Sequence, residues 1–418
     1  MSKNKKLIPE LRFPEFEKKG EWEYVNGNKL FEPISNKNHN SDLPILAITQ
    51  EQGAVPRDMI NYRVSVAEKS VESYKVVEIG DFIISLRSFQ GGIEYSNFKG
   101  LCSPAYIILR KKVDLENDYY RHYFKSVPFI RDLNRNLEGI RDGKMVSYQQ
   151  FSEILIPKPT NEEQQKIASC LLSLDEVIEA HSQKLELLKN HKKGLVQNLF
   201  PQEGEKVPKY RFKDFENDGE WVEKILGDVA EFSKGKGISK SDVIENGKIP
   251  CIRYGQLYTH YKETINDVIS YTNVPVKDLV LSQVNDVIIP SSGETQEDIA
   301  TASCVMKGGI ALGGDLNIIR SDINGVFLSY YLNNAKKKDI AQMAQGISVV
   351  HLYSSQLQNL KILIPSKSEQ QKIASCLSAL DVLITAQAEK IEQLKQHKKG
   401  LMQGLFPKSI TNYELRNN

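Results

Sequence analysis

One stretch of about forty residues occurs twice in this chain of 418 residues. Each copy opens with Glu-Gln-Gln-Lys-Ile-Ala-Ser-Cys-Leu, at Glu163 and again at Glu369, an offset of 206 positions (369 − 163). Each continues to His-Lys-Lys-Gly-Leu, at His191 and His397, and then to Leu-Phe-Pro. Because the register is shared over such a length, the fold must accommodate two copies of one long element.

Both copies are predicted to be single long helices, because apolar residues recur at steps of three and four. This spacing places them on one face, as in a heptad seam. Lys192 and Lys398 interrupt the seam at matching positions. The seam residues are Leu171, Leu174, Ile178, Leu185 and Leu188 in the first copy and Leu377, Leu380, Ile384, Ile391 and Leu394 in the second.

The first helix, over residues 161–199, would be about 58 Å long at about 1.5 Å per residue. Thr160 or Asn161 is expected to cap it, and Ser368 to cap the second helix. A narrow apolar stripe needs a partner in water, so we expect the two copies to pair antiparallel about a pseudo-twofold axis. The alternative is two amphipathic helices that each lie on their own domain.

His181 and Gln387 are repeat equivalents on the predicted seam. Single buried polar residues can fix the register of paired helices, so the two could form a polar layer. The alternative is that both lie in water at the edge of the seam. Neither residue is predicted to be catalytic.

The repeat also includes a segment ahead of each helix, Pro9-Glu-Leu-Arg-Phe-Pro-Glu-Phe-Glu and Pro208-Lys-Tyr-Arg-Phe-Lys-Asp-Phe-Glu. Each leads to Gly-Glu-Trp. Trp22 and Trp221 are therefore matched aromatics, and we expect them to anchor a domain edge rather than bind a ligand.

Between lead-in and helix the two halves diverge. Both contain strand-length apolar runs bounded by Gly, Pro, Asn and Asp, with helical stretches near 119–135 and 327–342. The predicted fold class is α/β (α+β), with two recognition domains separated by two long helices that form an antiparallel coiled coil. The predicted division is 1–160 for the first domain, 161–200 for the first helix, 201–367 for the second domain, 368–407 for the second helix and 408–418 for a C-terminal tail.

Charge and cysteine content limit the function and the compartment. A net charge of +2 means that nucleic-acid binding would require lysines and arginines gathered on one face. The five cysteines include no C-x-x-C pair, so small buried thiols are expected rather than metal ligands or disulfides. Without a signal peptide or a membrane-length apolar run, we expect a cytoplasmic, reduced protein.

Motifs for catalysis are missing. The glycine-rich segment from Gly308 lacks the lysine of a phosphate-binding loop, and the histidines lack metal-ligand spacing. Ser103-Pro-Ala-Tyr has only one of the two prolines with which amino-methyltransferases hold an extruded base, so we predict a turn before a strand. We therefore expect no catalytic residue, no cofactor site and no metal site.

Taken together, the two Ile-Leu-Ile-Pro segments, the paired Glu-Gln-Gln-Lys-Ile helices and the divergent domain ahead of each helix carry a family resemblance. The chain resembles the specificity subunit of type I restriction–modification systems. Val349-Val-His-Leu-Tyr-Ser-Ser-Gln-Leu also resembles the end of that family's target-recognition domains.

The resemblance implies a DNA-binding subunit in which each domain reads one half of an asymmetric bipartite site. The helices would set the gap between the halves and recruit two methyltransferase (modification) subunits that methylate adenine N6. S-adenosylmethionine, and ATP with Mg²⁺ for cleavage, would then be bound by the modification and restriction (endonuclease/translocase) subunits. Double-stranded DNA and these subunits are the expected partners, with no membrane.

Base and phosphate contacts are expected from polar residues in glycine-bearing loops. For each residue the alternative is an ordinary solvated side chain. In the first domain the candidates are Arg87, Gln90, Arg141 and Lys144, with Tyr148 near a phosphate. In the second they are Lys234, Lys236 and Lys240 at phosphates, Gln296 and Gln345 as readers, and Ser348 or Tyr353 in support.

Two other functions compete with DNA reading. A fused DNA methyltransferase would bind S-adenosylmethionine as an isolated chain. A coiled-coil scaffold that does not bind DNA would show interactions insensitive to salt, whereas binding to several phosphates weakens steeply as salt rises.

Overall fold

Repetition in the sequence is matched by repetition in the structure. The computed structural model describes residues 8–40, 42–60, 68–135, 146–346 and 349–407. The chain divides into two compact units, residues 1–182 with 389–418 and residues 183–388. Each unit contains a globular domain and part of both long helices, α6 (Asn161–Leu199) and α13 (Lys367–Leu405).

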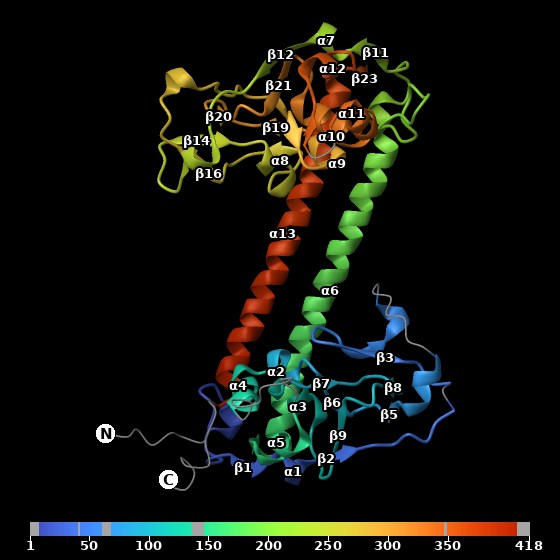
Figure 1. Cartoon of the computed structure of the whole chain (residues 1–418), viewed down its shortest axis with the longest axis vertical. Coiled ribbons are helices and arrows are strands. Elements are labelled where there is room, and N and C mark those ends of the chain that lie inside the picture. Colours follow the sequence, from blue (N-terminus) through green and yellow to red (C-terminus); the bar gives the residue numbers. More distant parts are fainter. Residues whose placement is uncertain (1–7, 41, 61–67, 136–145, 347–348, 408–418) are drawn as a thin grey trace. The chain divides into compact units, whose positions relative to one another are not determined.

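The domain of the first unit is a mixture of short strands and short helices (Figure 1). Its strands are β1 (Glu23–Asn26), β2 (Phe31–Ile34), β3 (Leu46–Thr49), β4 (Gly53–Pro56), β5 (Lys75–Val77), β6 (Phe82–Ile84), β7 (Glu94–Tyr95), β8 (Gly100–Cys102), β9 (Ile107–Lys111) and β10 (Leu155–Lys158). Its helices are η1 (Pro14–Phe16), α1 (Gly27–Leu30), η2 (Arg57–Met59), η3 (Glu68–Ser73), α2 (Ser88–Gly91), α3 (Asn117–Tyr123), α4 (Val127–Arg135) and α5 (Tyr148–Glu153).

A four-stranded antiparallel sheet in the order β2-β9-β6-β7 forms the centre of this domain. The pairs β3-β4, β5-β8 and β1-β10 complete the strands. An aromatic cluster that includes Phe31, Phe82 and Phe124 fills the core and continues to Leu171 of α6 and Leu405 of α13. The domain therefore packs on both long helices through the same core.

The domain of the second unit has the same kinds of element. Its strands are β11 (Val222–Ile225), β12 (Ala230–Lys234), β13 (Val243–Ile244), β14 (Ile249–Ile252), β15 (Thr264–Ile265), β16 (Ser270–Thr272), β17 (Val287–Pro290), β18 (Ser292–Gly293), β19 (Ser303–Val305), β20 (Ala311–Leu312), β21 (Leu316–Ser321), β22 (Val350–His351) and β23 (Lys361–Ile364). Its helices are η4 (Lys213–Phe215), α7 (Leu226–Val229), η5 (Lys240–Asp242), α8 (Gly255–Thr259), η6 (Val276–Asp278), α9 (Gln296–Ile299), α10 (Gly325–Asn334), α11 (Lys337–Met343) and α12 (Ser354–Gln358).

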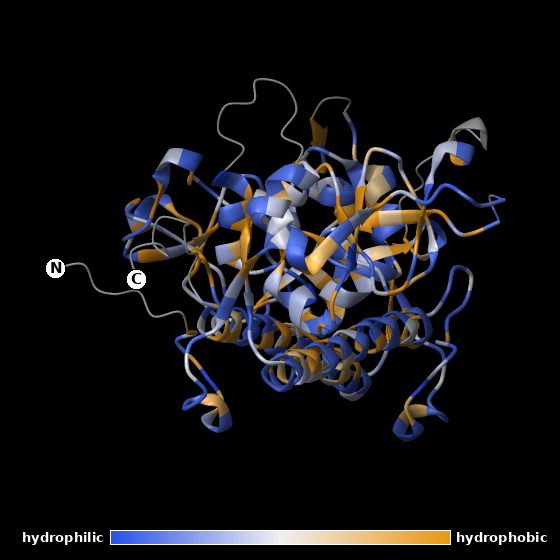
Figure 2. Ribbon diagram, turned by 90° about the horizontal axis from the view of Figure 1, so that it is seen from below, coloured by the Kyte–Doolittle hydropathy of each residue, from blue (hydrophilic) through white to orange (hydrophobic). Residues whose placement is uncertain are grey.

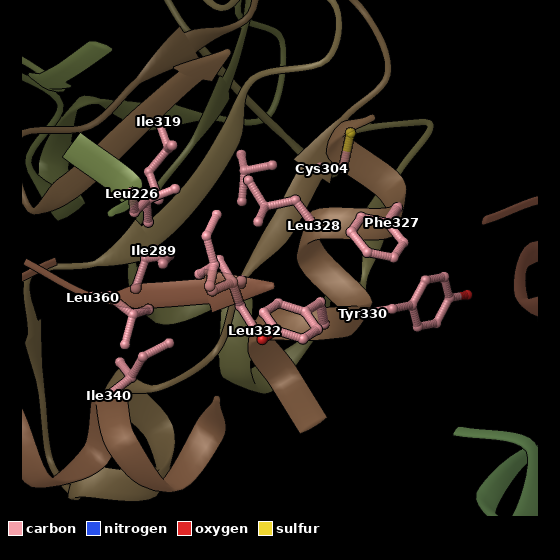
Figure 3. Close-up of a cluster of buried hydrophobic side chains, with 14 of the residues drawn as sticks. Leu226, Ile289, Cys304, Ile319, Phe327, Leu328, Tyr330, Leu332, Ile340 and Leu360 are labelled. Atoms are coloured by element: carbon pink, nitrogen blue, oxygen red, sulfur yellow. The ribbon is translucent and has the colours of Figure 1, made fainter. Parts of the chain in front are cut away.

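Here the sheets have the orders β12-β21-β17-β19-β15 and β13-β16-β14-β20, with the pairs β11-β23 and β18-β22. The core includes Leu226, Phe327 and Leu360 and continues to Val196 of α6 and Ile373 of α13. Figure 3 shows part of this cluster, in which the hydroxyl of Tyr330 points away from the other labelled side chains. The predicted mixed fold and the strand-length runs are confirmed in both domains.

The two domains share one fold despite their divergent sequences. In the first, Ile45 pairs parallel and Val76 antiparallel with Leu101. In the second, Cys251 pairs parallel and Leu281 antiparallel with Ala311. Each central sheet also carries a buried aspartate bound by both nitrogens of an arginine fork, Asp81 with Arg110 and Asp286 with Arg320, at 2.7–2.8 Å.

The repeated Glu-Gln pair at the start of each long helix ties the helix to its domain. Arg12 Nε and Nη2 donate to the Glu163 carboxylate at 2.7 and 2.8 Å, and Arg211 binds Glu369 in the same way at 2.8 and 2.7 Å. Both glutamates are 1% exposed. Because removing one partner of a buried ion pair strands the other charge, these residues have a structural role.

Within each unit the long helices run antiparallel. In the first unit, Lys398 of α13 pairs with Asp175 of α6, while Leu405 shares a core with Leu171. In the second, Lys192 of α6 donates to Asp381 of α13 at 2.7 Å, and Val196 shares a core with Ile373. The expected antiparallel pairing is confirmed, and the lysines that seemed to interrupt the seam form its ion pairs.

Each of these aspartates also contacts its own domain. His122 Nε2 of α3 lies 2.9 Å from Asp175 Oδ2, and the Tyr330 hydroxyl of α10 donates to Asp381. Burial and the hydrogen bond to Asp381 raise the pKa of Tyr330. Burial alone would raise the pKa of Asp175, but hydrogen bonds from His122 and Lys398 lower it. Each aspartate therefore links the domain, α6 and α13.

The ten predicted seam residues are all buried or half-buried. Figure 2 shows hydrophobic and hydrophilic residues alternating along the long helices, as such a stripe requires. Gln387 is 8% exposed and His181 is half-buried, so Gln387 lies within the stripe rather than at a solvated edge.

One predicted cap was wrong. The Glu369 backbone N–H donates to Ser366 Oγ at 3.3 Å, so Ser366 caps α13 and the helix begins one residue before Ser368. In the first copy, Glu163 N–H donates to Thr160 Oγ1 at 3.4 Å, as predicted. Thr160 and Ser366 are repeat equivalents, which explains the shared start.

The matched tryptophans and the cysteines are core residues. Trp22 and Trp221 are buried in the cores of their domains, as predicted. All five cysteines are free thiols, and Cys102, Cys251 and Cys304 are buried. Burial raises the pKa of Cys102 and of Cys304 to about 12, so these thiols stay protonated at neutral pH. In the described part of the chain, no helix combines the length and apolar character needed to cross a membrane.

Asp175→Asn is expected to lower the free energy of unfolding by about 1–2 kcal/mol at pH 7, since it weakens two charge-assisted hydrogen bonds at a partly exposed site. The folded-state pKa of Asp175 is depressed, so this stabilisation exists above the unfolded pKa and is lost as pH falls through the folded value. Urea unfolding of the wild type and the variant at pH 7 and at acid pH measures this difference in the free energy of unfolding. Lys395→Ala, in an exposed pair with Glu392, is the control, and an Asp175→Asn effect no larger than this control's would contradict the prediction.

Candidate nucleic-acid interface

The shared fold creates a cleft at the same place in each domain. One wall is the end of β3 in the first domain and the end of β14 in the second. The other wall is a hydrogen-bonded turn before the next long strand. Tyr106 N–H donates to Ser103 O at 3.1 Å in the first domain, and Leu316 N–H donates to Gly313 O at 3.2 Å in the second. We call these spaces cleft 1 and cleft 2.

Cleft 1 has a volume of about 870 Å³. It is open to solvent, and its lining mixes polar side chains with apolar ones, of which Met59 is 64% exposed. The polar residues that line it include Thr49, Gln50, Gln52, Arg57, Arg87 and Tyr106. Such a mixture of amides, guanidinium groups and an aromatic ring is suited to hydrogen bonding with base edges and phosphates.

Two guanidinium groups, those of Arg57 and Arg87, and one carboxylate, that of Glu51, line cleft 1. Burial raises the pKa of Tyr106, while the nearby charges of Arg57 and Arg87 act in the opposite direction. Arg57, Arg87 and Tyr106 all line the same space. Among the residues that the structure describes, Arg87 forms no ion pair, so its donors remain available.

Backbone contacts hold the rim of cleft 1 in place. Gln50 Nε2 donates to Arg87 O at 3.4 Å, and Ser85 N–H donates to Ser88 Oγ at 2.9 Å. Gly92, which follows α2, adopts a φ of +81°, and a Cβ there would lie 2.0 Å from Phe124 O. Packing inside the domain therefore requires this glycine. The expectation from the sequence had been that glycines in this loop serve contact with DNA.

Cleft 2 is smaller, about 330 Å³, and carries acidic groups. Arg253, Tyr254, Asp242 and Asp315 line it together with Gly313. Asp242 Oδ2 accepts from Ser239 N–H at 2.7 Å, which fixes its carboxylate within the wall. Asp315 is exposed, and its carboxylate accepts from Ser292 Oγ at 3.4 Å.

Two backbone features shape cleft 2. Ile238 has a φ of 60°, which is an uncommon and costly conformation for a β-branched residue. Gly235 directly follows β12, and a Cβ there would lie 1.9 Å from Gly313 O. Only glycine therefore lets the end of this strand approach the turn that forms the cleft wall.

In the first domain, Arg87 and Gln90 are exposed at the two ends of α2, and Arg87 lines cleft 1 while Gln90 does not. Tyr148 is half-buried, and its hydroxyl donates to Phe31 O at 3.1 Å. Arg141 and Lys144 lie outside the described residues.

In the second domain, Lys234, Lys236 and Lys240 are exposed along the segment that leads into cleft 2. Lys234 Nζ lies 5.9 Å from the centre of the Tyr353 ring, so these two candidates are neighbours. Gln296 Nε2 donates to Ala344 O at 3.5 Å, and Gln345 pairs with His351 through its backbone. Ser348 lies outside the described residues.

The chain matches the family model of the type I restriction modification DNA specificity domain twice, over residues 7–190 and 218–396. Together the two matches cover most of the chain. The chain belongs to this family. It is accordingly a specificity subunit of a type I restriction–modification system, and such a subunit is a non-catalytic part of the complex.

Similar proteins carry the same description. The type I restriction enzyme MjaVIII specificity subunit of Methanocaldococcus jannaschii is 26% identical, over 97% of this chain and 96% of that protein. The putative MjaX specificity subunit of the same organism is 25% identical, over 93% and 94%. The S subunit of the type I system from M. genitalium matches in fold, with a TM-score of 0.56, 16% identity and coverage of 96% and 100%.

The sequence of this specificity subunit did not single out Arg57, Gln50, Arg253 or Asp315 as site residues. Ser103-Pro-Ala-Tyr was noticed, and the predicted turn before a strand is confirmed, but its place in a cleft wall was not foreseen. The spacing to the next strand differs, because Ser103 lies four residues before the start of β9 and Gly313 three residues before the start of β21, so the sequence carried no common signal for the two turns. Among the described residues, no group of three potential ligands could hold a metal ion.

Tyr148→Phe separates an internal role from a phosphate contact. If the hydroxyl serves the fold, its loss leaves the Phe31 carbonyl with one partner fewer and lowers the free energy of unfolding by about 1 kcal/mol. DNA affinity should then be unchanged at permissive temperature. A drop in DNA affinity with unchanged urea unfolding would instead assign Tyr148 to a phosphate.

Proposed function

We propose that this specificity subunit binds double-stranded DNA and that each domain reads one half of an asymmetric bipartite site. The observation that carries the proposal is a pair of equivalent clefts whose side chains differ. A repeated frame with identical clefts would suit two copies of one half-site. Different donors and acceptors at the same place suit two different half-sites.

The long helices support a role in spacing. α6 and α13 each run for 39 residues without a break, and each contributes to both units. The aspartate–lysine pairs fix the register of the two helices in each unit. A rigid element of this kind can keep a constant number of unspecified base pairs between two half-sites.

We infer that the chain acts with other subunits. Two modification subunits would bind the helices and adjoining surfaces, methylate adenine N6 and bind S-adenosylmethionine. Restriction subunits would bind ATP and Mg²⁺ for cleavage. Adenine must leave the base stack to be methylated, so the reader would hold flanking base pairs and leave that base accessible. This chain would bind no cofactor, and its DNA substrate suggests a cytoplasmic location.

The proposal is tested by mapping methylated adenines in DNA. The DNA comes from cells that carry this chain together with its modification subunits. A single split motif with two unlike halves and a fixed gap is the expected result. Cells without this chain serve as the control and should lack the motif. Palindromic halves, or methylation independent of the chain, would contradict the proposal.

A heptad insertion tests the spacing role. Duplicating residues 182–188 in α6 and 388–394 in α13 lengthens both helices by about 10.5 Å, or roughly three base pairs, while the seam is retained. The half-sites should stay the same and the gap should grow by about three base pairs.

Duplicating only residues 182–188 is the matched control, because it shifts α6 against α13 between the two ion pairs. Assembly with the modification subunits and methylation should then be lost. A gap that stays unchanged after the double insertion would refute the spacing role.

A further inference from the structure

We propose that cleft 1 and cleft 2 are base-reading sites whose balance of charged side chains is opposite, with Arg87 reading guanine in one and Asp315 reading a base amino group in the other. This inference rests on the proposed function, because it assigns the contacts of the DNA that each domain would read. It goes further by stating which class of base each domain requires.

The equivalence of the clefts comes from the strand register. Leu101 and Ala311 occupy the same position between a parallel and an antiparallel neighbour. The turn that follows each of them has the same internal hydrogen bond, so Ala105 and Asp315 occupy the same step of the turn. The fold therefore retains this position of the turn in both domains, while the side chain at that position differs.

Cleft 1 offers a ligand two guanidinium groups beside the single carboxylate of Glu51. Arg87 lies at the N-terminal end of α2, is exposed, and is fixed through its backbone by Gln50. Arg57 and Tyr106 line the same space. A guanidinium group makes its most specific base contact with the O6 and N7 acceptors of guanine, so a guanine in the first half-site is the expected partner.

Cleft 2 carries two carboxylates and one guanidinium group instead. The Asp315 carboxylate is exposed and accepts one hydrogen bond, from Ser292 Oγ at 3.4 Å, whereas Asp242 Oδ2 accepts from both the backbone N–H and the hydroxyl of Ser239. A carboxylate repels phosphates but accepts a hydrogen bond from an exocyclic amino group, usually that of cytosine. Arg253 lines the same cleft, and it could contact guanine of the same base pair. The second half-site should therefore contain a position that requires an amino base.

The lysines near cleft 2 are placed to contact phosphates, while Asp315 would contact a base. Lys234, Lys236 and Lys240 are exposed on the neighbouring segment, where they can balance phosphate charge that Asp315 would repel. The acidic group can then act on selectivity without preventing DNA binding.

The test uses the complete complex of this chain with its modification subunits and maps methylated adenines for single variants. Arg87→Ala should relax selectivity at one guanine of the first half-site by roughly 5- to 150-fold and leave the second half-site unchanged. Asp315→Ala should relax one cytosine or adenine position of the second half-site by a similar factor. Asp315→Asn, which adds an amide donor, should shift that position toward adenine.

Lys29→Ala is the control, since Lys29 is an exposed basic residue on α1 that does not line cleft 1, and both half-sites should be unchanged. A midpoint of thermal unfolding equal to that of the wild type shows that the fold of each variant is intact. Uniform weakening across all sequences in Arg87→Ala would make it a phosphate contact and overturn the inference, as would relaxation in the wrong half-site. If the wild-type complex itself yields no bipartite motif, the proposed function fails instead.

Discussion

The structure depends on one junction that occurs in each unit, an aspartate of one long helix held by a lysine of the other. Asp175 binds Lys398, and Asp381 binds Lys192. The lysine fixes how the helices slide against each other, because a shift by one turn would leave a partly buried charge without its partner. His122 and Tyr330 add the domain to the same contact.

The Arg–Glu pairs complete this arrangement. Arg12 and Arg211 bind buried glutamates at the starts of α6 and α13, so each lead-in is tied to a helix end. Since both pairs join parts of the same unit, the junctions make helix pairing and domain attachment interdependent. A specificity subunit needs this property, because a reading surface that moves freely on its helix could not maintain a defined distance from the other half-site.

The domains themselves show how one fold can serve different sequences. The buried Asp–Arg fork in each central sheet and the turn beside each cleft are retained. The side chains that line the clefts are not, as Ala47 and Ile48 in one correspond to Arg253 and Tyr254 in the other. Packing therefore constrains the frame, while half-buried cleft positions such as these are free to vary with the DNA to be read.

The duplication, the two long helices, their seam and the mixed character of the domains can all be predicted from the sequence, since they depend on local periodicity and on a repeat with a fixed offset. The sequence also named Arg87 as a candidate DNA contact, because the residue lies in a segment that ends in a glycine pair. Only the tertiary structure brought Arg57, Arg87 and Tyr106 to one cleft, and showed that Lys192 and Lys398 complete the seam instead of interrupting it. The reason is physical. Periodicity reports which face of an element is buried, whereas a cleft and a long-range ion pair join residues whose separation along the chain carries no regular signal.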